Sequence, residues 1–555
     1  MVAPLAGETA VSAKRAELSG KTGSRGCSVT RRQHVSDFSR HWEVWFMDGM
    51  FAQVLTMPAF QAATQDYAKE TGIEQGMLTS ILELGAWVGT LANGYLADAL
   101  GRRLTVLVAV VVFCVGVIVQ ACTQSADFVF AGRFVTGLGV GSLSMVVPLY
   151  NAELAPPEIR GSLVAVQQLA ITFGIMVSFW IGYGTNYIGG TGATQSDAAW
   201  LIPVCIQILP AIILAVGMMI PPRHLMNTGR EEECLQTLAR LRNAPPDDLL
   251  VRIEFLEIKS LYLFERETAA EKYPDWQDDS FSSRFKIGLH DYMSLITDKS
   301  LFKRTATACM IMVFQQWNGI NAINYYAPFI FKEMHLGGNT ISLLATGVVG
   351  IFEFVFTIPA VLWVDKVGRK KILIAGAIGM ASCHFIVAGI IGAYQGKSKT
   401  TQLPAGWLLS LFGFSSSTSP THGVFPLSMR AKGVSIGGSS NWLNNFAVAT
   451  ATSPFLQASN FGAFIFFGCI TTIAVFYVIF LVPETKGRTL EEMDELFGSV
   501  GLAAADSGRK HRIEREIGLL ALVGVEPADE KHTEAGMDES KVEVSKYEDV
   551  SSPKN

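Results

Sequence analysis

Charged residues are scarce in this chain. Asp, Glu, Lys and Arg make up 17% of its 555 residues, whereas soluble globular domains carry about 25%. The formal net charge is only −5, so no basic excess points to nucleic acid as a partner. Because 49% of the residues are hydrophobic, this shortage of charge argues against an ordinary soluble protein.

Paired cysteines and catalytic constellations are also lacking. None of the eight cysteines forms a CxxC pair, and no nucleophile–base set or metal-ligand spacing is present. Six cysteines lie in apolar runs and are interpreted as small membrane-core residues: Cys114, Cys122, Cys205, Cys309, Cys383 and Cys469. The polar first forty residues contain no apolar segment typical of a signal peptide. We therefore expect no enzyme activity, no metal and no bound cofactor.

Long apolar runs are what the chain has in abundance. Most approach the ~20 residues that a helix needs to cross a bilayer. They predict spans near 43–60, 77–97, 104–122, 127–149, 163–184, 200–220, 306–331, 341–364, 372–394, 433–457 and 461–482, with a short doubtful run near 406–414. The pattern predicts an all-α membrane protein of two six-helix halves, nominally twelve transmembrane helices with the tenth truncated or broken.

The charged segments divide the chain into five parts. We expect an N-terminal tail (1–42), a first half (43–222), a helical linker domain (223–305), a second half (306–483) and a C-terminal tail (484–555). Basic residues in the short loops and the linker place the linker and both tails in the cytosol. The tail after Phe497 is polar and is expected to be disordered.

The two halves repeat a loop motif. "DALGRR" follows the second span and "DKVGRK" follows the eighth. A weaker echo pairs "ELAPPEIRG" with "GVFPLSMRAKG", although Gly423 stands where symmetry predicts an acid. Alternating-access transporters are built from related halves, so these loops predict a cytosolic gate; a plain positive-inside loop is the alternative. The gate candidates from the repeats are Asp98, Arg102, Arg103, Glu153, Arg160, Asp365, Arg369 and Arg430.

One span is rich in amides. "FQQWNGINAINYYAPFIF" contains Gln315, Gln316, Asn318, Asn321 and Asn324, which cannot all face lipid without a large cost. Amides both donate and accept hydrogen bonds, as a polyol requires, and the neighbouring Tyr and Trp rings can stack on a sugar. Contacts between helices are the alternative role. Further candidates for the same site are Gln167, Gln168, Asn441, Trp442 and Asn445.

Carboxylates inside spans are candidate proton carriers. Asp48, Glu83 and Glu353 lie in the first, second and eighth predicted spans. The alternative for each is a pairing with a buried cation or a place in a water-filled cavity. The sequence leaves these roles open.

Six segments in order resemble the sugar porter family of the major facilitator superfamily, especially fungal monosaccharide transporters. They are "GYLADALGRR", "AGRFVTGLGVG", "PLYNAELAPPEIRG", "QQWNGINAINYYAPFIF", "VDKVGRK" and "VPETKGRTLEEMDELFG". The resemblance implies a twelve-helix fold, a cytosolic helical domain between the halves, and hexose or pentose transport. By resemblance, the sugar-contacting positions are Gln168, Gln315, Gln316, Asn321, Asn441 and Trp442, and the cytosolic gate holds Arg102, Arg103, Arg133, Glu153, Arg160 and Glu484.

The first span departs from the family. Symporting members carry an Asp in a G-Y-D-x-G pattern, but here "WFMDGMF" places Met47 at that position and Asp48 one residue later. A shift of one residue turns a helical side chain by about 100°. Glu353 stands where many relatives have Asn. Transport is therefore either facilitated or driven by protons through Asp48 or Glu353.

The tenth span is the largest departure. "SLFGFSSSTSPTHGVFPLSMRAKG", Ser410 to Gly433, stops being apolar after a few residues, so the run is too short to cross a bilayer alone. Pro420 and the serines disfavour a continuous helix. The stretch is either a deletion or gene-model error, or a broken helix lining a cavity that protein covers.

These features together predict a monomeric, multi-pass sugar transporter of the plasma membrane that works by alternating access. Its expected partners are a small sugar, protons if transport is coupled, and the lipid bilayer. One alternative is transport of another polyhydroxylated or secondary metabolite from a biosynthetic gene cluster. The other is a non-transporting sugar sensor, which the short tail without signalling repeats disfavours.

Overall fold

The computed structural model describes residues 50–64, 73–154, 160–192, 194–217, 222–274, 281–333, 339–394, 430–484 and 500–524. The regular elements in these residues are α-helices, which confirms the predicted all-α class. The segment 410–425, whose status the sequence left open, lies outside the described residues, as does Asp48.

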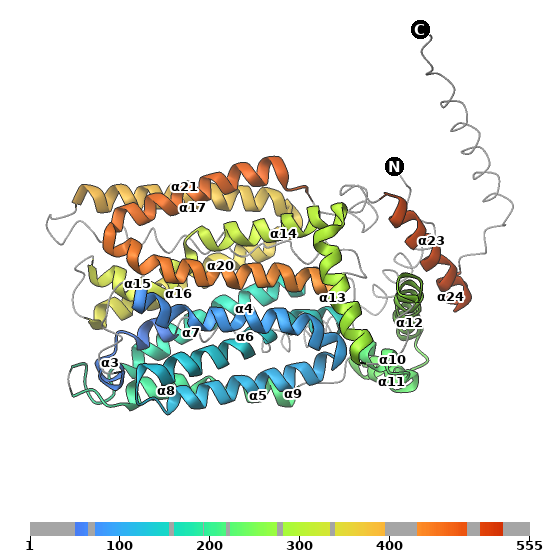
Figure 1. Cartoon of the computed structure of the whole chain (residues 1–555), viewed down its shortest axis with the longest axis horizontal. Coiled ribbons are helices and arrows are strands. Elements are labelled where there is room, and N and C mark those ends of the chain that lie inside the picture. The colour runs from blue at the N-terminus through green and yellow to red at the C-terminus, as the bar shows by residue number, and fades with distance from the viewer. Residues whose placement is uncertain are drawn as a thin grey trace, which may run out of the picture.

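The long helices lie side by side in one bundle (Figure 1). The N-terminal half contains α3 (Pro58–Ala63), α4 (Ile73–Ala99), α5 (Arg102–Ala121), α6 (Ala126–Leu154), α7 (Arg160–Thr185), α8 (Ala198–Ile206) and α9 (Ile208–Gly217). The C-terminal half contains α14 (Lys299–Trp317), α15 (Ile320–Glu333), α16 (Asn339–Val367), α17 (Arg369–Tyr394), α20 (Arg430–Ala458) and α21 (Asn460–Leu481). Between them come α10 (Pro222–Asn227), α11 (Glu231–Arg242), α12 (Leu249–Lys272) and α13 (Phe281–Thr297).

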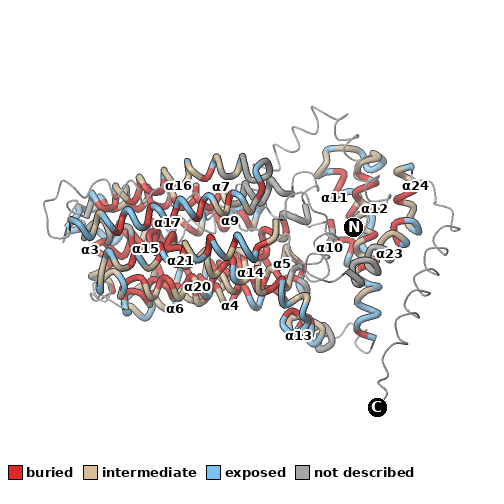
Figure 2. The backbone as a smooth tube through the Cα atoms, turned by 90° about the horizontal axis from the view of Figure 1, so that it is seen from above, coloured by how far each residue is buried: buried red, intermediate tan, exposed pale blue. Residues whose placement is uncertain are grey.

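The surface of the bundle is apolar where a soluble protein would be polar. Val216 is 82% exposed and Phe480 is 78% exposed, and exposed residues follow the outer helices (Figure 2). Seven helices of the described chain are long and apolar enough to cross a membrane. The helices α4 and α20, of 27 and 29 residues, lie in the same bundle. A lipid environment explains why large apolar side chains remain outside.

Two predicted spans are each interrupted. The span expected at 306–331 is divided into α14 and α15, and the span expected at 200–220 is divided into α8 and α9 at Gln207. The sequence did not predict either interruption as such. The first one positions the polar residues described below.

Glycines allow the helices of the N-terminal half to touch backbone to backbone. A Cβ atom at Gly141 of α6 would lie 2.0 Å from the carbonyl oxygen of Ala86 on α4, and one at Gly137 would lie 2.1 Å from that of Leu82. No side chain fits at such a separation. The motif "AGRFVTGLGVG" is therefore a packing motif in this half.

The two halves meet along a seam formed by two antiparallel helix pairs. In one pair α4 packs along α20, and in the other α7 packs along α16. Ser80 and Thr450 hydrogen-bond across the first pair at 2.7 Å, and the ring centroids of Phe173 and Phe354 lie 5.6 Å apart across the second. Movement of one half against the other must break these contacts.

The linker helices α10, α11 and α12 lie beyond one end of the bundle, here called the linker end (Figure 1). A small core of their own joins them, with Leu225, Cys234, Leu238 and Val251 among its buried members. Helix α13 packs against α4, α14 and α20 and thus lies across the seam.

The expected disorder of the C-terminal tail is wrong for part of its length. Residues 500–524 contain α23 (Val500–Glu516) and α24 (Leu519–Val523), which lie beside α12 (Figure 2). The tail is polar on average, but "IGLLALV" supplies apolar side chains, and Leu519 and Leu520 are buried against Ile253 of α12. The composition of residues 500–524 did not predict this docking because the partner surface on α12 lies far away in the sequence.

Candidate functional site

A break in the seventh span lies near the seam. Helix α14 ends at Trp317 and α15 begins at Ile320, and Gly319 adopts φ 90°, in the left-handed region. Glycine reaches this region without the steric penalty of a side chain. The Asn318 side-chain oxygen accepts a hydrogen bond of 3.1 Å from the Ile320 backbone nitrogen and so caps the new helix. The break redirects the chain between two amide residues, Gln316 and Asn321.

The amides on both sides of the break join two amides of α20. Gln316 Nε2 donates to Asn441 Oδ1 at 2.6 Å, and Asn321 Nδ2 contacts Gln316 Oε1 at 2.5 Å and Asn445 Oδ1 at 3.1 Å. Asn445 Nδ2 donates to the Tyr325 hydroxyl at 2.8 Å. We call Gln316, Asn321, Tyr325, Asn441 and Asn445 the amide cluster.

Burial forces the side chains of the amide cluster to pair with one another. Gln316 is 2% exposed, and Asn445 and Tyr325 are buried as well. Amides that cannot reach water must find partners inside the protein, and here they find one another. The same donors and acceptors can be exchanged for the hydroxyl groups of a ligand without leaving a polar atom unpaired.

Trp442 connects the two halves beside this cluster. Its indole Nε1 donates to the Ser144 hydroxyl of α6 at 3.0 Å, and its ring packs into the apolar core of the N-terminal half. A neighbouring indole, Trp317, donates to Asn444 Oδ1 at 2.9 Å. Ser144 and Asn444 were not among the predicted residues. A lone serine in a span carries no distinctive signal, whereas Asn444, an amide beside Asn445, carried the same signal as the predicted residues and was missed.

Two predicted sugar-contacting residues are not drawn into the amide cluster. Gln315 lines a small, partly open pocket between α14, α17 and α21, together with Asn318, Thr471 and Tyr477. Consecutive helical residues point about 100° apart, which separates Gln315 from Gln316. Gln168 is half-buried on α7, a helix that pairs with α16. The structure thus brings together Gln316, Asn321 and Asn441, with Trp442 next to them.

His384 of α17 was missed by the sequence reasoning. Its Nε2 lies 2.7 Å from the backbone oxygen of Asn318, and its side chain is 0% exposed between the rings of Phe464 and Phe467. A carbonyl oxygen only accepts, so Nε2 is the donor. This hydrogen bond pairs the backbone carbonyl of Asn318, the residue directly after α14. A lone histidine in the apolar run 372–394 was the available signal.

Among the described residues of the bundle, two acids are buried. Glu353 of α16 is 4% exposed, and the Asn324 side chain of α15 hydrogen-bonds to it. Its Oε2 atom finds no hydrogen-bond partner in the described residues. Glu83 is buried on α4, in the other half. Glu353 is thus linked through α15 to the helix that carries part of the amide cluster.

The predicted gate residues fall mostly at helix ends. Successive helices alternate in direction, so the ends of α4, α6 and α16 and the starts of α5, α7, α17 and α20 all lie at the linker end. Arg102 Nη1 donates to the Ala97 carbonyl at 2.8 Å, and Arg103 and Glu484 are half-buried. The remaining side chains lie outside what the structure describes: Asp98, Glu153, Arg160, Asp365, Arg369 and Arg430.

Arg133 is not placed with the other gate residues. It lies in the second turn of α6, about 30 Å of helix from the end at Leu154. Its Nη2 donates to the Thr79 carbonyl at 2.8 Å, and its guanidinium lies 3.6 Å from the centre of the Phe51 ring. This arginine ties helices of the N-terminal half together near the end opposite the linker.

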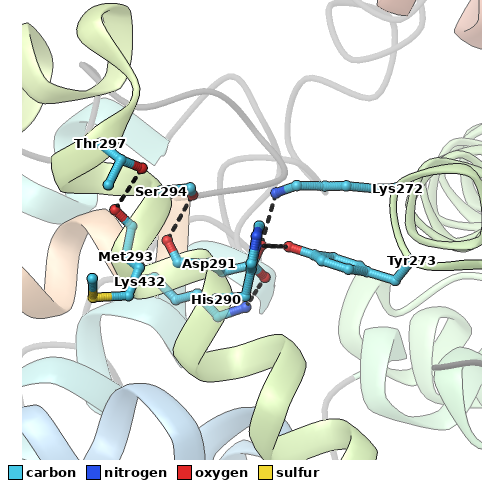
Figure 3. A network of polar contacts seen from close by, with 8 residues as sticks. All are labelled: Lys272, Tyr273, His290, Asp291, Met293, Ser294, Thr297 and Lys432. Atoms are coloured by element: carbon cyan, nitrogen blue, oxygen red, sulfur yellow. Dashed lines mark hydrogen bonds and ion pairs between the residues drawn. The ribbon is translucent and has the colours of Figure 1, made fainter. Parts of the chain in front are cut away.

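A charged junction centred on Asp291 connects the linker to α20 (Figure 3). Lys272 Nζ lies 2.8 Å from one carboxylate oxygen, and Lys432 Nζ lies 2.6 Å from the other. The Tyr273 hydroxyl donates to Asp291 and lies 3.0 Å from His290 Nδ1. Burial opposes ionisation of Asp291, but Lys432 and hydrogen bonds from Lys272, Lys432 and Tyr273 outweigh it and lower the pKa of the carboxyl. We call this group the Asp291 junction.

The residue after Asp291 lies across the seam itself. The Tyr292 hydroxyl donates to Ser435 Oγ of α20 at 3.0 Å, and Ser435 Oγ donates to the Thr90 carbonyl of α4 at 2.9 Å. Gly94 of α4 makes room, since a Cβ atom there would lie 1.6 Å from the Tyr292 hydroxyl oxygen. Helix α13 therefore joins both halves at the linker end.

An apolar helical bundle of two halves, with a buried polar cluster near their seam, is the architecture of a major facilitator transporter. The family model described as "Sugar (and other) transporter" matches residues 35–497, so the chain belongs to the sugar transporter family. It is a multi-pass membrane transporter, and its relatives and fold are not those of enzymes.

Relatives and solved structures agree with this membership. A quinate permease of Emericella nidulans is 31% identical over 467 residues, covering 80% of this chain and 84% of that protein. A quinate permease of Neurospora africana is 32% identical over 471 residues, with 80% and 84% covered. The proton:xylose symporter XylE bound to 6-bromo-6-deoxy-D-glucose is similar in structure, with a TM-score of 0.64, 25% identity, and 86% of this chain and 100% of that chain covered.

Proposed function

We propose that this chain transports a hexose or pentose by alternating access, with the sugar held at the amide cluster. The observation that carries this proposal is the meeting of Gln316 and Asn321 with Asn441 and Asn445 in the interior of the bundle. Transporter sites in such folds lie between the two halves near mid-membrane. The cluster satisfies its own polar atoms while empty and offers them to hydroxyl groups when a sugar enters.

Neighbouring rings suit the apolar face of a sugar. Tyr325 belongs to the cluster, Trp317 borders the break, and Trp442 follows Asn441 directly. Sugars present hydroxyl edges and apolar C–H faces, so a site with both amides and rings matches both surfaces.

The contacts between α4 and α20 support alternating access. Ser80 and Thr450 meet on one side of the cluster, and Thr90 and Ser435 meet nearer the linker end. Opening one set of contacts while the other stays closed would expose the cluster to one side of the membrane. The charged helix ends at the linker end would form the gate, with the linker and both termini in the cytosol of a monomer at the plasma membrane.

We assign proton coupling to Glu353 rather than to Asp48. Glu353 is buried and bonds to Asn324 of α15, the helix that carries Asn321 and Tyr325. Protonation of a buried carboxyl removes a charge that is costly in the membrane, so its state is coupled to rearrangement of α15. The similarity to a proton:xylose symporter supports a coupled mechanism.

A carboxylated polyol is the second candidate substrate, because two relatives are quinate permeases. An anion in the bundle requires a positive partner. In the described part of the bundle two cations are buried. Arg133 is engaged with Phe51 and Thr79, and Arg304 lies near the start of α14, about 18 Å of helix from Gln316. The amide cluster and the nearby acid Glu353 favour the neutral sugar.

The test is uptake of radiolabelled D-glucose, D-xylose and quinate in a transporter-null host. We expect uptake of at least one of the two sugars, inhibited poorly by quinate. Gln316→Ala should raise the KM about tenfold or more, because two partner amides lose their hydrogen bonds. Gln120→Ala is the matched control, since Gln120 is also a buried amide but its side chain donates to Thr136 within the N-terminal half, at 2.7 Å.

Two outcomes would contradict the proposal. Uptake of quinate but of neither sugar would show that the substrate is the carboxylated polyol, the second candidate above. An unchanged KM in Gln316→Ala, with normal amounts of protein in the membrane, would show that the amide cluster is not the binding site.

A further inference from the structure

The helices α23 and α24 lie beyond the part of the chain that matches the family, which ends at residue 497. Arg509 of α23 pairs with Glu271 and donates to the Thr268 hydroxyl at 3.1 Å. Arg512 pairs with Glu267 at 2.6 Å. All three partners are on α12, so a basic helix face meets an acidic one.

Apolar contacts hold the other end of this segment. Leu519 and Leu520 of α24 are buried against Ile253, and Leu249 and Leu256 of α12 pack around them. The contacts on α12 thus extend from Leu249 in its first turn to Glu271 in its last, about 33 Å of helix. We call residues 500–524 the C-terminal brace.

The brace grips the same end of α12 that binds the bundle. Glu267, Thr268 and Glu271 directly precede Lys272 and Tyr273, which bind Asp291 on α13 (Figure 3). Asp291 also binds Lys432 of α20, and the adjacent Tyr292 lies across the seam. A continuous series of contacts therefore runs from the brace to the two helices that must separate at the linker end.

We propose that the C-terminal brace is an autoinhibitory element that keeps the linker end closed. The proposal rests on the alternating-access function proposed above. Opening at the linker end requires Ser435 to leave Thr90 and requires Tyr292 to leave the seam. With α12 fixed by the brace, Lys272 and Tyr273 retain Asp291 in its closed position. Releasing α12 lets α13 move with one half.

The strength of the brace suits a contact that can be released. Glu271 and Arg512 are both exposed, so their ion pairs are screened by salt and individually weak. The buried leucines of α24 add a short apolar anchor. A brace of this kind slows opening without preventing it.

The test compares uptake by the full chain with uptake by a chain lacking residues 500–555. We expect the deletion to raise the maximal uptake rate at least about threefold, with little change in KM. Loss of the exposed ion pairs alone changes an equilibrium by about that factor, and the deletion also removes the leucine anchor. The double variant Arg509→Glu, Arg512→Glu should do the same in the full chain. Adding Glu267→Arg and Glu271→Arg should restore the original rate by exchanging the charges.

Arg515→Glu is the matched control, because Arg515 is an exposed arginine on the same helix. It should leave the uptake rate unchanged. The proposal is overturned if the deletion leaves the rate unchanged or lowers it at equal amounts of protein in the membrane. It is equally overturned if the exchanged charges fail to restore the rate.

Hydrogen exchange on the purified full chain separates this inference from the substrate assignment. Deletion of the brace should speed exchange in α13 and in the first turns of α20, whatever the protein carries. If the full chain takes up neither sugar, the proposed substrate fails while this measurement still tests the brace. Unchanged hydrogen exchange in both α13 and the first turns of α20 overturns the proposed role of the brace.

Discussion

The two halves of the bundle differ in how their helices pack. In the N-terminal half, α6 approaches α4 through Gly137 and Gly141 at backbone contact, and a large apolar core surrounds them. In the C-terminal half, the seventh span is broken at Gly319. Its interior carries the amide cluster, His384 and Glu353.

The difference indicates a division of labour. Close backbone packing resists deformation because interiors packed at this density transmit strain instead of absorbing it. A helix break with exchangeable amide partners offers several hydrogen-bonding arrangements of similar energy. We infer that the N-terminal half acts as the rigid frame and that the C-terminal half carries binding and coupling.

The largest effect is expected from overpacking the rigid frame. Gly141→Ala places a methyl group 2.0 Å from the Ala86 carbonyl oxygen and should destabilise the protein by about 3 kcal/mol. Gly379→Ala is the control in the other half, where no neighbouring helix of the described chain comes within 4 Å of the added Cβ atom, and it should be neutral or slightly stabilising. Thermal unfolding of the purified protein measures both. Equal melting temperatures for the two variants would contradict the inference that the N-terminal half is packed more rigidly than the C-terminal half.

The next largest effect concerns coupling. Glu353→Gln should abolish sugar accumulation, which one proton per sugar can drive about 50-fold at 100 mV, while exchange of labelled for unlabelled sugar continues. Glu83→Gln tests the buried acid of the other half and should leave accumulation intact. Uptake at steady state with and without an uncoupler provides the measurement. Loss of accumulation in Glu83→Gln alone would move coupling into the N-terminal half.

The smallest effect is expected at the helix break. His384→Phe keeps the ring but removes the donor to the Asn318 carbonyl, and it should raise the KM by about five- to tenfold. His384→Gln should restore most of the affinity because its amide nitrogen reaches as far as Nε2, whereas His384→Asn should not. Ser382→Ala, on an exposed face of the same helix, is the control. If His384→Phe and His384→Gln have the same KM, the hydrogen bond from His384 does not position the break at Gly319.

Parts of this organisation were predictable and parts were not. The spans expected at 372–394, 433–457 and 461–482 correspond closely to α17, α20 and α21, because length and apolar character are local properties. The Asn-Gly pair at 318–319 is a turn signal, yet the surrounding apolar residues predicted one continuous span. The docking of α23 depends on α12, about 240 residues earlier, and local polarity concealed it.

The sequence by itself determined that this is a membrane transporter, which family it belongs to, and where most helices lie. Apolar run length and family motifs are contained in short segments and need no partner. Only the tertiary structure decided that Gln316 joins Asn441, 125 residues away, while its neighbour Gln315 faces a separate cavity. Which polar groups pair depends on helix rotation and on distant neighbours, because a buried donor must find its acceptor wherever the packing places one.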